Sequence, residues 1–103
     1  MAQYDVYENT DSATRVAKPY LLDVQSELLE TLTTRVVVPL ISGAEISHPV
    51  EILNPMVQVL NQKHFASCAE ICSVPTGIFG KKITHLNQQQ RDNIENALGL
   101  LLT

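Results

Sequence analysis

The sequence has no tryptophan and few other aromatic residues, with three tyrosines and two phenylalanines among 103 residues. Its hydrophobic fraction is nevertheless 45%, so its core must be built mainly from valine, isoleucine and leucine. A composition this apolar excludes an intrinsically disordered chain. The length suits one domain, and no repeat or linker divides the chain, so we expect a single domain over residues 1–103.

Basic residues are also scarce, and they are scattered. Eleven acidic residues outnumber seven lysines and arginines, which gives a net charge of −4. Only Lys81 and Lys82 are adjacent. Proteins that bind nucleic acid through its phosphates usually carry a cluster of basic residues. The sequence therefore predicts no direct contact with nucleic acid.

Long apolar runs are missing as well, since none approaches the roughly 20 residues that cross a bilayer. Residues 1–5 have neither the basic start nor the apolar stretch of a secretory signal. We therefore expect a cytoplasmic protein without membrane contact. Cys68 and Cys72 are not spaced as a redox pair or as half of a zinc site. In the cytoplasm we expect both to be buried free thiols.

No hydrolase, nucleotide-loop or metalloprotease motif occurs. His48, His64 and His85 fall in different predicted elements, so we expect surface or hydrogen-bonded histidines, with no metal site and no cofactor. Asp23 and Glu27 have neither a nucleophile nor a metal beside them for acid–base chemistry. These absences predict a binding protein with no catalytic residues, not an enzyme.

Short runs of β-branched and aromatic residues, separated by turn residues, predict an antiparallel β-rich domain. The expected strands are residues 2–7, at the edge of the sheet, then 20–24, 35–40, 56–60 and 63–68, with shorter extended pieces at 73–76 and 78–79. The unbroken apolar run of residues 35–40 predicts burial on both faces, with Pro39 marking the end or the edge of the strand.

Three connections are less regular. Residues 41–55 predict a long loop, with a short strand within it as the alternative, and Asn61-Gln62 predicts a hairpin turn. Residues 27–30 fit either a helical turn or a plain connection between strands. The only clear helix is C-terminal, where Asn87 and Gln90 have the spacing of a capping box. Its apolar stripe comprises Ile94, Ala97, Leu98 and Leu101.

Two blocks of the sequence carry a family pattern. Residues 23–29 read DVQSELL and residues 35–40 read RVVVPL. They resemble the D-V-Q-S-[DE]-[IL]-[IL] and R-[ML]-V-I-P-L blocks of the CcdB family, the gyrase poisons of bacterial type II toxin–antitoxin modules. Residues 73–75 match the S-V-P segment of that family, and residues 94–98 match the start of its last helix. The resemblance covers essentially the whole chain except the tail.

The resemblance implies a mainly β fold with a C-terminal α-helix. In this fold, which the MazF-type toxins share, an SH3-like, barrel-type antiparallel sheet carries a small accessory sheet. It also implies a homodimer and a CcdA-like antitoxin whose disordered C-terminal segment folds on the toxin. The target would be the A subunit of DNA gyrase, trapped in its DNA-cleaved state. Inhibition of this topoisomerase would serve plasmid maintenance.

By resemblance, the gyrase-binding residues are Leu28, Leu29, Gly99, Leu102 and Thr103. Two adjacent apolar residues cannot both point inward from one strand, so we expect at least one of the two leucines to be exposed. Core packing is the alternative for this pair, and terminal fraying is the alternative for Leu102.

The tail departs from the family pattern. Members typically end in Gly-Ile, preceded in the best-known member by an aromatic residue, whereas this sequence ends at Thr103 without either. A weak toxin, a different mode of contact or a shortened chain would each explain the difference. Two other functions stay open: a degenerate toxin that binds only the antitoxin as a decoy, and an mRNA endoribonuclease of the MazF/Kid type. The ribonuclease would require a basic groove, of which the sequence gives little sign.

Overall fold

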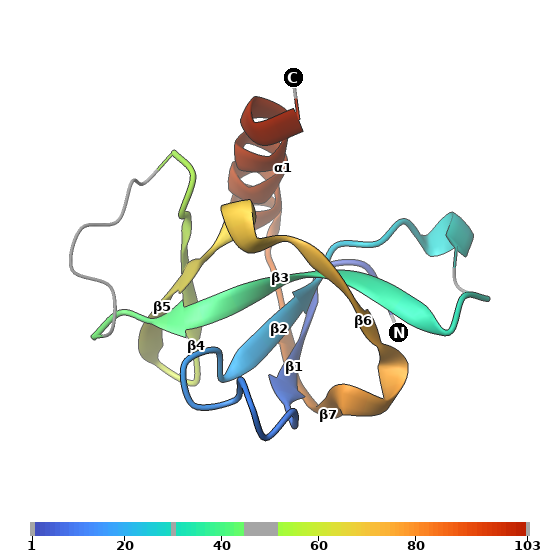
Figure 1. Ribbon diagram of the computed structural model, residues 1–103. Coiled ribbons are helices and arrows are strands. Elements are labelled where there is room, and N and C mark those ends of the chain that lie inside the picture. Colours follow the sequence, from blue (N-terminus) through green and yellow to red (C-terminus); the bar gives the residue numbers. More distant parts are fainter. Residues whose placement is uncertain (1, 30, 45–51, 103) are drawn as a thin grey trace.

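A strongly curled antiparallel sheet with one helix against it makes up the computed structural model, which describes residues 2–29, 31–44 and 52–102 (Figure 1). The strands are β1 (Asp5–Asn9), β2 (Tyr20–Asp23), β3 (Thr34–Ser42), β4 (Met56–Val59), β5 (Gln62–Ala66), β6 (Cys72–Pro75) and β7 (Phe79–His85). The helices are the short 3-10 turns η1 (Glu27–Leu29), η2 (Cys68–Glu70) and η3 (Thr76–Ile78), and the α-helix α1 (Gln88–Leu102). The strand order is β4-β5-β3-β2-β1-β7, and β6 pairs with β3 beside this path.

The central strands of the sheet are buried on both faces. On one face, Val6, Leu22 and Val38 lie opposite one another in neighbouring strands and belong to the core that α1 covers. On the other face, the paired residues Tyr7 and Leu21 are also buried, because the sheet curls around them. Removing these apolar side chains from water supplies about 25 cal/mol per Å² of stabilisation.

Strand β3 is the longest strand and joins the parts of the sheet. Its first half pairs with β6 and its last residues pair with β5, while β2 runs along its other side. Burial on both faces is confirmed, but the prediction that Pro39 ends the strand or lies at its edge is wrong. Pro39 lies between the β6 and β5 pairings, where its carbonyl accepts the Ser67 N–H at 2.9 Å. A residue without an N–H is tolerated at this break in the ladder.

Strand β1 is not the edge strand that the sequence predicts. It begins at Asp5, after a turn in which Tyr4 has a φ of 71°, and it lies between β2 and β7. The sequence predicted only a short extended piece before Gly80, so the partner strand β7 was missed. Gly80 permits the close pairing, because a Cβ there would lie 2.9 Å from Thr10 Cγ2 and 3.0 Å from Glu8 Cβ.

The β4–β5 hairpin turns one residue earlier than the sequence predicts. Val59 pairs with Gln62, so Leu60 and Asn61 form the turn, with φ values of 52° and 64°. Positive φ at both positions is typical of a two-residue type I′ turn. The small accessory sheet of the resemblance corresponds to this hairpin, which stays joined to the end of β3.

Helix α1 begins with the predicted capping box. The Asn87 N–H donates to Gln90 Oε1 at 3.0 Å, and the Gln90 N–H donates to Asn87 Oδ1 at 2.8 Å. On the predicted apolar stripe, Ile94 and Ala97 are buried under the sheet, whereas Leu101 is exposed. The stripe is therefore confirmed in the first half of the helix, and the last turn extends beyond the sheet (Figure 1).

The two cysteines differ in burial. Cys68 is buried as predicted, but Cys72 is exposed, so the prediction of two buried thiols is wrong. The strand-like spacing assumed for them does not apply, because η2 begins at Cys68 and a new strand begins at Cys72.

We therefore expect one fast and one slow thiol. Burial raises the pKa of the Cys68 thiol to about 11, so this thiol stays protonated and shielded in the folded protein near neutral pH. A colorimetric disulfide reagent should modify Cys72 rapidly and Cys68 only after unfolding. The variant Cys72→Ser should lose the fast phase alone. Two fast thiols in the folded protein would contradict this assignment.

Candidate functional site

The η1 turn projects two leucines into solvent. The side chain of Leu28 is 93% exposed and that of Leu29 is 49% exposed, and Leu32 just beyond the turn is also exposed. Neither Leu28 nor Leu29 packs in the core, so the expectation of an exposed apolar pair is confirmed. The choice left open for residues 27–30 is resolved as a helical turn for Glu27–Leu29, while Glu30 lies outside the described residues.

Ser26 initiates the turn. Its hydroxyl oxygen accepts the Leu28 N–H at 3.2 Å, and its carbonyl accepts the Leu29 N–H at 3.0 Å. The Leu29 carbonyl in turn accepts the Leu32 N–H at 3.2 Å. A serine that satisfies the free N–H groups at the start of a helical turn is a typical cap.

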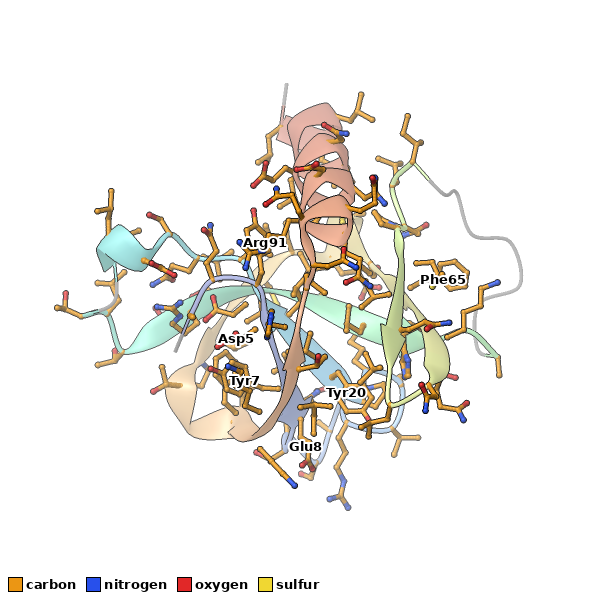
Figure 2. All side chains as sticks on the ribbon, turned by 180° about the vertical axis from the view of Figure 1, so that it is seen from behind. Asp5, Tyr7, Glu8, Tyr20, Phe65 and Arg91 are labelled. Carbon is orange, nitrogen blue, oxygen red and sulfur yellow. The ribbon has the colours of Figure 1, made fainter. Side chains whose placement is uncertain are left out.

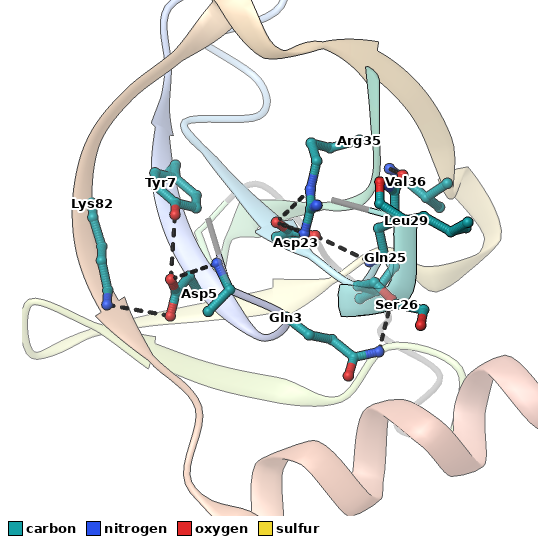
Figure 3. A network of polar contacts seen from close by, with 12 residues as sticks. Gln3, Asp5, Tyr7, Asp23, Gln25, Ser26, Leu29, Arg35, Val36 and Lys82 are labelled. Carbon is teal, nitrogen blue, oxygen red and sulfur yellow. Dashed lines mark hydrogen bonds and ion pairs between the residues drawn. The ribbon is translucent and has the colours of Figure 1, made fainter. Parts of the chain in front are cut away.

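Gln25 ties this turn to the sheet, and its buried side chain makes two hydrogen bonds. Its Nε2 donates to the Leu29 carbonyl at 2.9 Å, and its Oε1 accepts the Val36 N–H at 3.0 Å. Its own N–H donates to Asp23 Oδ1 at 3.0 Å, as Figure 3 shows. The buried side-chain amide of Gln25 thus connects the end of η1 with β3, and its backbone N–H connects it with β2.

A buried ion pair supports Gln25 in turn. The side chains of Arg35 and Asp23 are 1% and 0% exposed. Asp23 Oδ2 accepts a hydrogen bond from Arg35 Nε at 2.9 Å and lies 2.6 Å from Nη2, although Nη2 lacks hydrogen-bond alignment to any partner. Burial raises the pKa of Asp23, and the hydrogen bonds from Arg35 and from the Gln25 N–H oppose this rise.

A second polar cluster lies beside this pair inside the curl of the sheet (Figure 3). The Tyr7 hydroxyl donates to Asp5 Oδ2 at 3.2 Å, and Lys82 Nζ lies 3.4 Å from Asp5 Oδ1. Burial raises the pKa of Tyr7, and the negative charge of Asp5 adds to the increase. The Tyr7 ring stacks on Phe79 at 4.8 Å between centroids, so this cluster joins β1 to β7.

The end of α1 forms a separate apolar surface. Leu100 and Leu102 are exposed, and no atom lies within 4 Å of the position that a Cβ on Gly99 would take. Thr103 lies outside the described residues. Figure 1 shows the η1 turn and the helix end at different corners of the molecule, so one chain does not bring Leu28 and Leu29 together with Gly99 and Leu102.

Among residues 2–29, 31–44 and 52–102, no group of histidine, cysteine and acidic side chains is arranged to hold a metal ion. His64 is buried, with Nδ1 3.1 Å from the Gln62 carbonyl, and His85 is exposed. Both match the expectation, while His48 lies outside the described residues. In the same described ranges, no helix is long and apolar enough to cross a membrane.

Sequence reasoning missed the roles of Gln25 and Arg35. Both belong to the family blocks, but the sequence alone gave no reason for a charged or amide side chain to be buried there. The available signal was the position of Arg35 at the start of the most apolar run in the chain. A polar residue in a strand that is buried on both faces requires a partner.

Removing Arg35 should destabilise the protein strongly. In Arg35→Met the Asp23 carboxylate stays buried without its partner, which costs about 3–5 kcal/mol. The double variant Asp23→Asn/Arg35→Met removes both charges and should recover most of the loss. Urea unfolding of both, with Arg15→Met as an exposed control, measures the difference. If Arg35→Met is as stable as the unmodified protein, the pair is not the support described above.

Comparisons with known proteins agree with this architecture. The structure of the Mycobacterium tuberculosis toxin MazF-mt6 superposes with a TM-score of 0.74 at 20% identity, covering 93% of each chain. The structure of an Mtb toxin gives a TM-score of 0.73 at 21% identity, covering 92% of this chain and 97% of that one. Both share the fold, which confirms the predicted barrel-type sheet with a C-terminal helix. The family model for the CcdB protein matches residues 3–103. The chain therefore belongs to the CcdB family, the toxins of toxin–antitoxin systems.

Proposed function

We propose that this protein binds the A subunit of DNA gyrase and poisons the enzyme, as the toxin of a type II module. The observation that carries the proposal is the η1 turn, where Leu28 and Leu29 are exposed while Ser26 and Gln25 fix the backbone beneath them. Exposed large apolar side chains that form a contiguous patch are typical of protein interaction sites. A rigid turn loses little entropy when it docks, so its contacts contribute more of their energy to affinity.

We propose that the protein acts by occupying its target and not by catalysis. An mRNA endoribonuclease would need charged groups within reach of a phosphodiester. Arg35 and Asp23, whose side chains form the most deeply buried ion pair of the described residues, are removed from solvent and join β2 to β3. This burial favours a structural role for the pair and leaves it unable to act on a phosphodiester.

The working unit that we propose is a homodimer in the cytoplasm. The η1 turn and the end of α1 are separate apolar surfaces on one chain (Figure 1). A twofold axis could place the turn of one copy near the helix end of the other and form one larger target surface. A CcdA-like antitoxin would neutralise the toxin by binding to it, and the disordered segment of that antitoxin would fold on contact.

The direct test is binding of the full chain to the gyrase A subunit. Leu28→Ala should weaken binding by tens-fold, because truncating an interface anchor commonly costs about 2 kcal/mol or more. Leu29→Ala should have a smaller effect, since that side chain is less exposed. Isothermal titration calorimetry of both variants gives these ratios. Binding of the unmodified chain should also increase DNA cleavage by the gyrase holoenzyme.

The matched control is Val16→Ala, which truncates an aliphatic side chain that is 88% exposed but lies in the β1–β2 loop. This variant should bind gyrase like the unmodified protein. If Leu28→Ala and Val16→Ala bind equally well, the η1 turn is not the target surface. If the unmodified chain binds an antitoxin but not gyrase, the decoy alternative is favoured and the gyrase proposal is wrong.

A further inference from the structure

A groove of about 580 Å³ lies between the β1–β2 loop, strand β7 and the β4–β5 turn. Glu8 and Tyr20, which are paired partners in β1 and β2, line it. Figure 2 shows both residues below the base of α1. They lie further along the face on which α1 covers Val6 and Leu22. The helix does not reach this end of the face, so Glu8 and Tyr20 line an open groove and are not covered as Val6 and Leu22 are.

The groove brings together the two basic residues that have no partner among the described residues, Arg15 and Lys81, with Lys82 beside them. Arg15, Lys81 and Lys82 line it, with Glu8 as the single carboxylate. Because Lys82 is paired with Asp5, the unpaired charges of the groove are Arg15, Lys81 and Glu8, which give a local excess of one positive charge in a chain with a net charge of −4. The side chains of Arg15 and Lys81 make no hydrogen bond or ion pair within the described ranges, and Lys82 has only the 3.4 Å contact with Asp5.

The other basic residues are all engaged elsewhere. Lys18 pairs with Glu70 at 2.6 Å, and Arg35 is buried against Asp23. The remaining two, Lys63 and Arg91, lie over the aromatic rings of Phe65 and Tyr4. In the sequence the cations are scattered and predict no nucleic-acid contact, but in the fold Arg15 and Lys81, the two without a partner among the described residues, line the same groove.

Leu60 supplies a second, independent observation. It occupies the type I′ turn with a φ of 52°, a conformation that favours asparagine or glycine and strains a leucine. Its side chain is also 66% exposed and lines the groove. Strained and exposed residues of this kind concentrate at functional sites. At this position the leucine side chain would give a ligand an apolar surface to pack against.

We propose that this groove binds a nucleotide unit, with the phosphate on Arg15 and Lys81 and the base against Tyr20, Leu60 and Ile83. The groove places free cations next to apolar side chains, and a nucleotide carries a phosphate next to an apolar base face. The Tyr20 ring is held by an edge contact with His64, 5.2 Å between centroids. The Glu8 carboxylate can accept a hydrogen bond from a base amino group or a ribose hydroxyl.

An acidic peptide is the competing occupant, and two features favour the nucleotide. The groove carries a carboxylate, which would repel a peptide rich in aspartate and glutamate but can accept the donors of a base or sugar. Its volume of about 580 Å³ lies within the usual range for a small ligand. The inference is independent of gyrase binding and includes no cleavage step. The nucleotide could come from a free pool or from a single strand, and the test distinguishes these sources.

The probe is a short fluorescein-labelled oligouridylate, and its fluorescence anisotropy is followed against protein concentration at several salt concentrations. Binding should weaken with salt with a logarithmic slope of about −0.7, the value for one phosphate of a single strand. Arg15→Glu and Lys81→Glu should each lower the affinity about tenfold. Displacement by uridine monophosphate would identify a free nucleotide as sufficient, and displacement by unlabelled oligouridylate alone would identify a strand.

Lys63→Glu is the matched control, because it makes the same change in net charge at an exposed lysine outside the groove. It should bind the probe like the unmodified protein. Leu60→Asn should weaken binding while leaving the thermal midpoint unchanged or higher, since asparagine suits the turn.

Three results would overturn the proposal. One is no binding of oligouridylate or uridine monophosphate at low salt. Another is an equal loss of affinity in Lys63→Glu and Lys81→Glu. The last is binding of oligoglutamate, but not oligouridylate, with the same dependence on Arg15 and Lys81. Gyrase binding should persist in Lys81→Glu, so either idea can fail without the other.

Discussion

The buried ion pair between Arg35 and Asp23 supports the Gln25 contacts that tie the η1 turn to the sheet. The two charges are almost fully removed from water, a cost that their mutual attraction and the Gln25 N–H must offset. Because Asp23 Oδ1 accepts that N–H at 3.0 Å, the pair sets the position of Gln25. Gln25 Nε2 then donates to the Leu29 carbonyl at 2.9 Å. Leu28 is therefore exposed on a turn whose backbone conformation is restricted.

This arrangement gives a physical meaning to the two sequence blocks that identify the family. The first block supplies Asp23, Gln25 and Ser26, and the second supplies Arg35 and the Val36 N–H that Gln25 accepts. The polar residues of the blocks thus support the turn from within, while the leucines face solvent. Strand β3 joins this support to the rest of the sheet, since it pairs with β2 along one side and with β5 and β6 along the other.

Local signals in the sequence predicted local structure well. The Asn87–Gln90 capping box, the buried run of β3 and an exposed leucine in η1 each depend on neighbouring residues. Long-range pairing could not be predicted in the same way: β1 is central only because β7 returns to it from far along the chain. The exposure of Cys72 could not be predicted either, because it depends on the 3-10 turn η2, which no local pattern indicates. The groove was also hidden, because Arg15 and Lys81 meet only in the fold.

Amide hydrogen exchange at Leu29 tests most directly whether the buried network fixes the turn. In Gln25→Met, the Leu29 carbonyl and the Val36 N–H both lose their partner, so the turn should open more often. We expect the Leu29 amide, which donates to the Ser26 carbonyl at 3.0 Å, to exchange at least about tenfold faster than in the unmodified protein, a change of about 1.4 kcal/mol in opening free energy. The amide of the core residue Ile94 should exchange at an unchanged rate. Unchanged exchange at Leu29 would show that the turn is held by its own residues and would contradict the account.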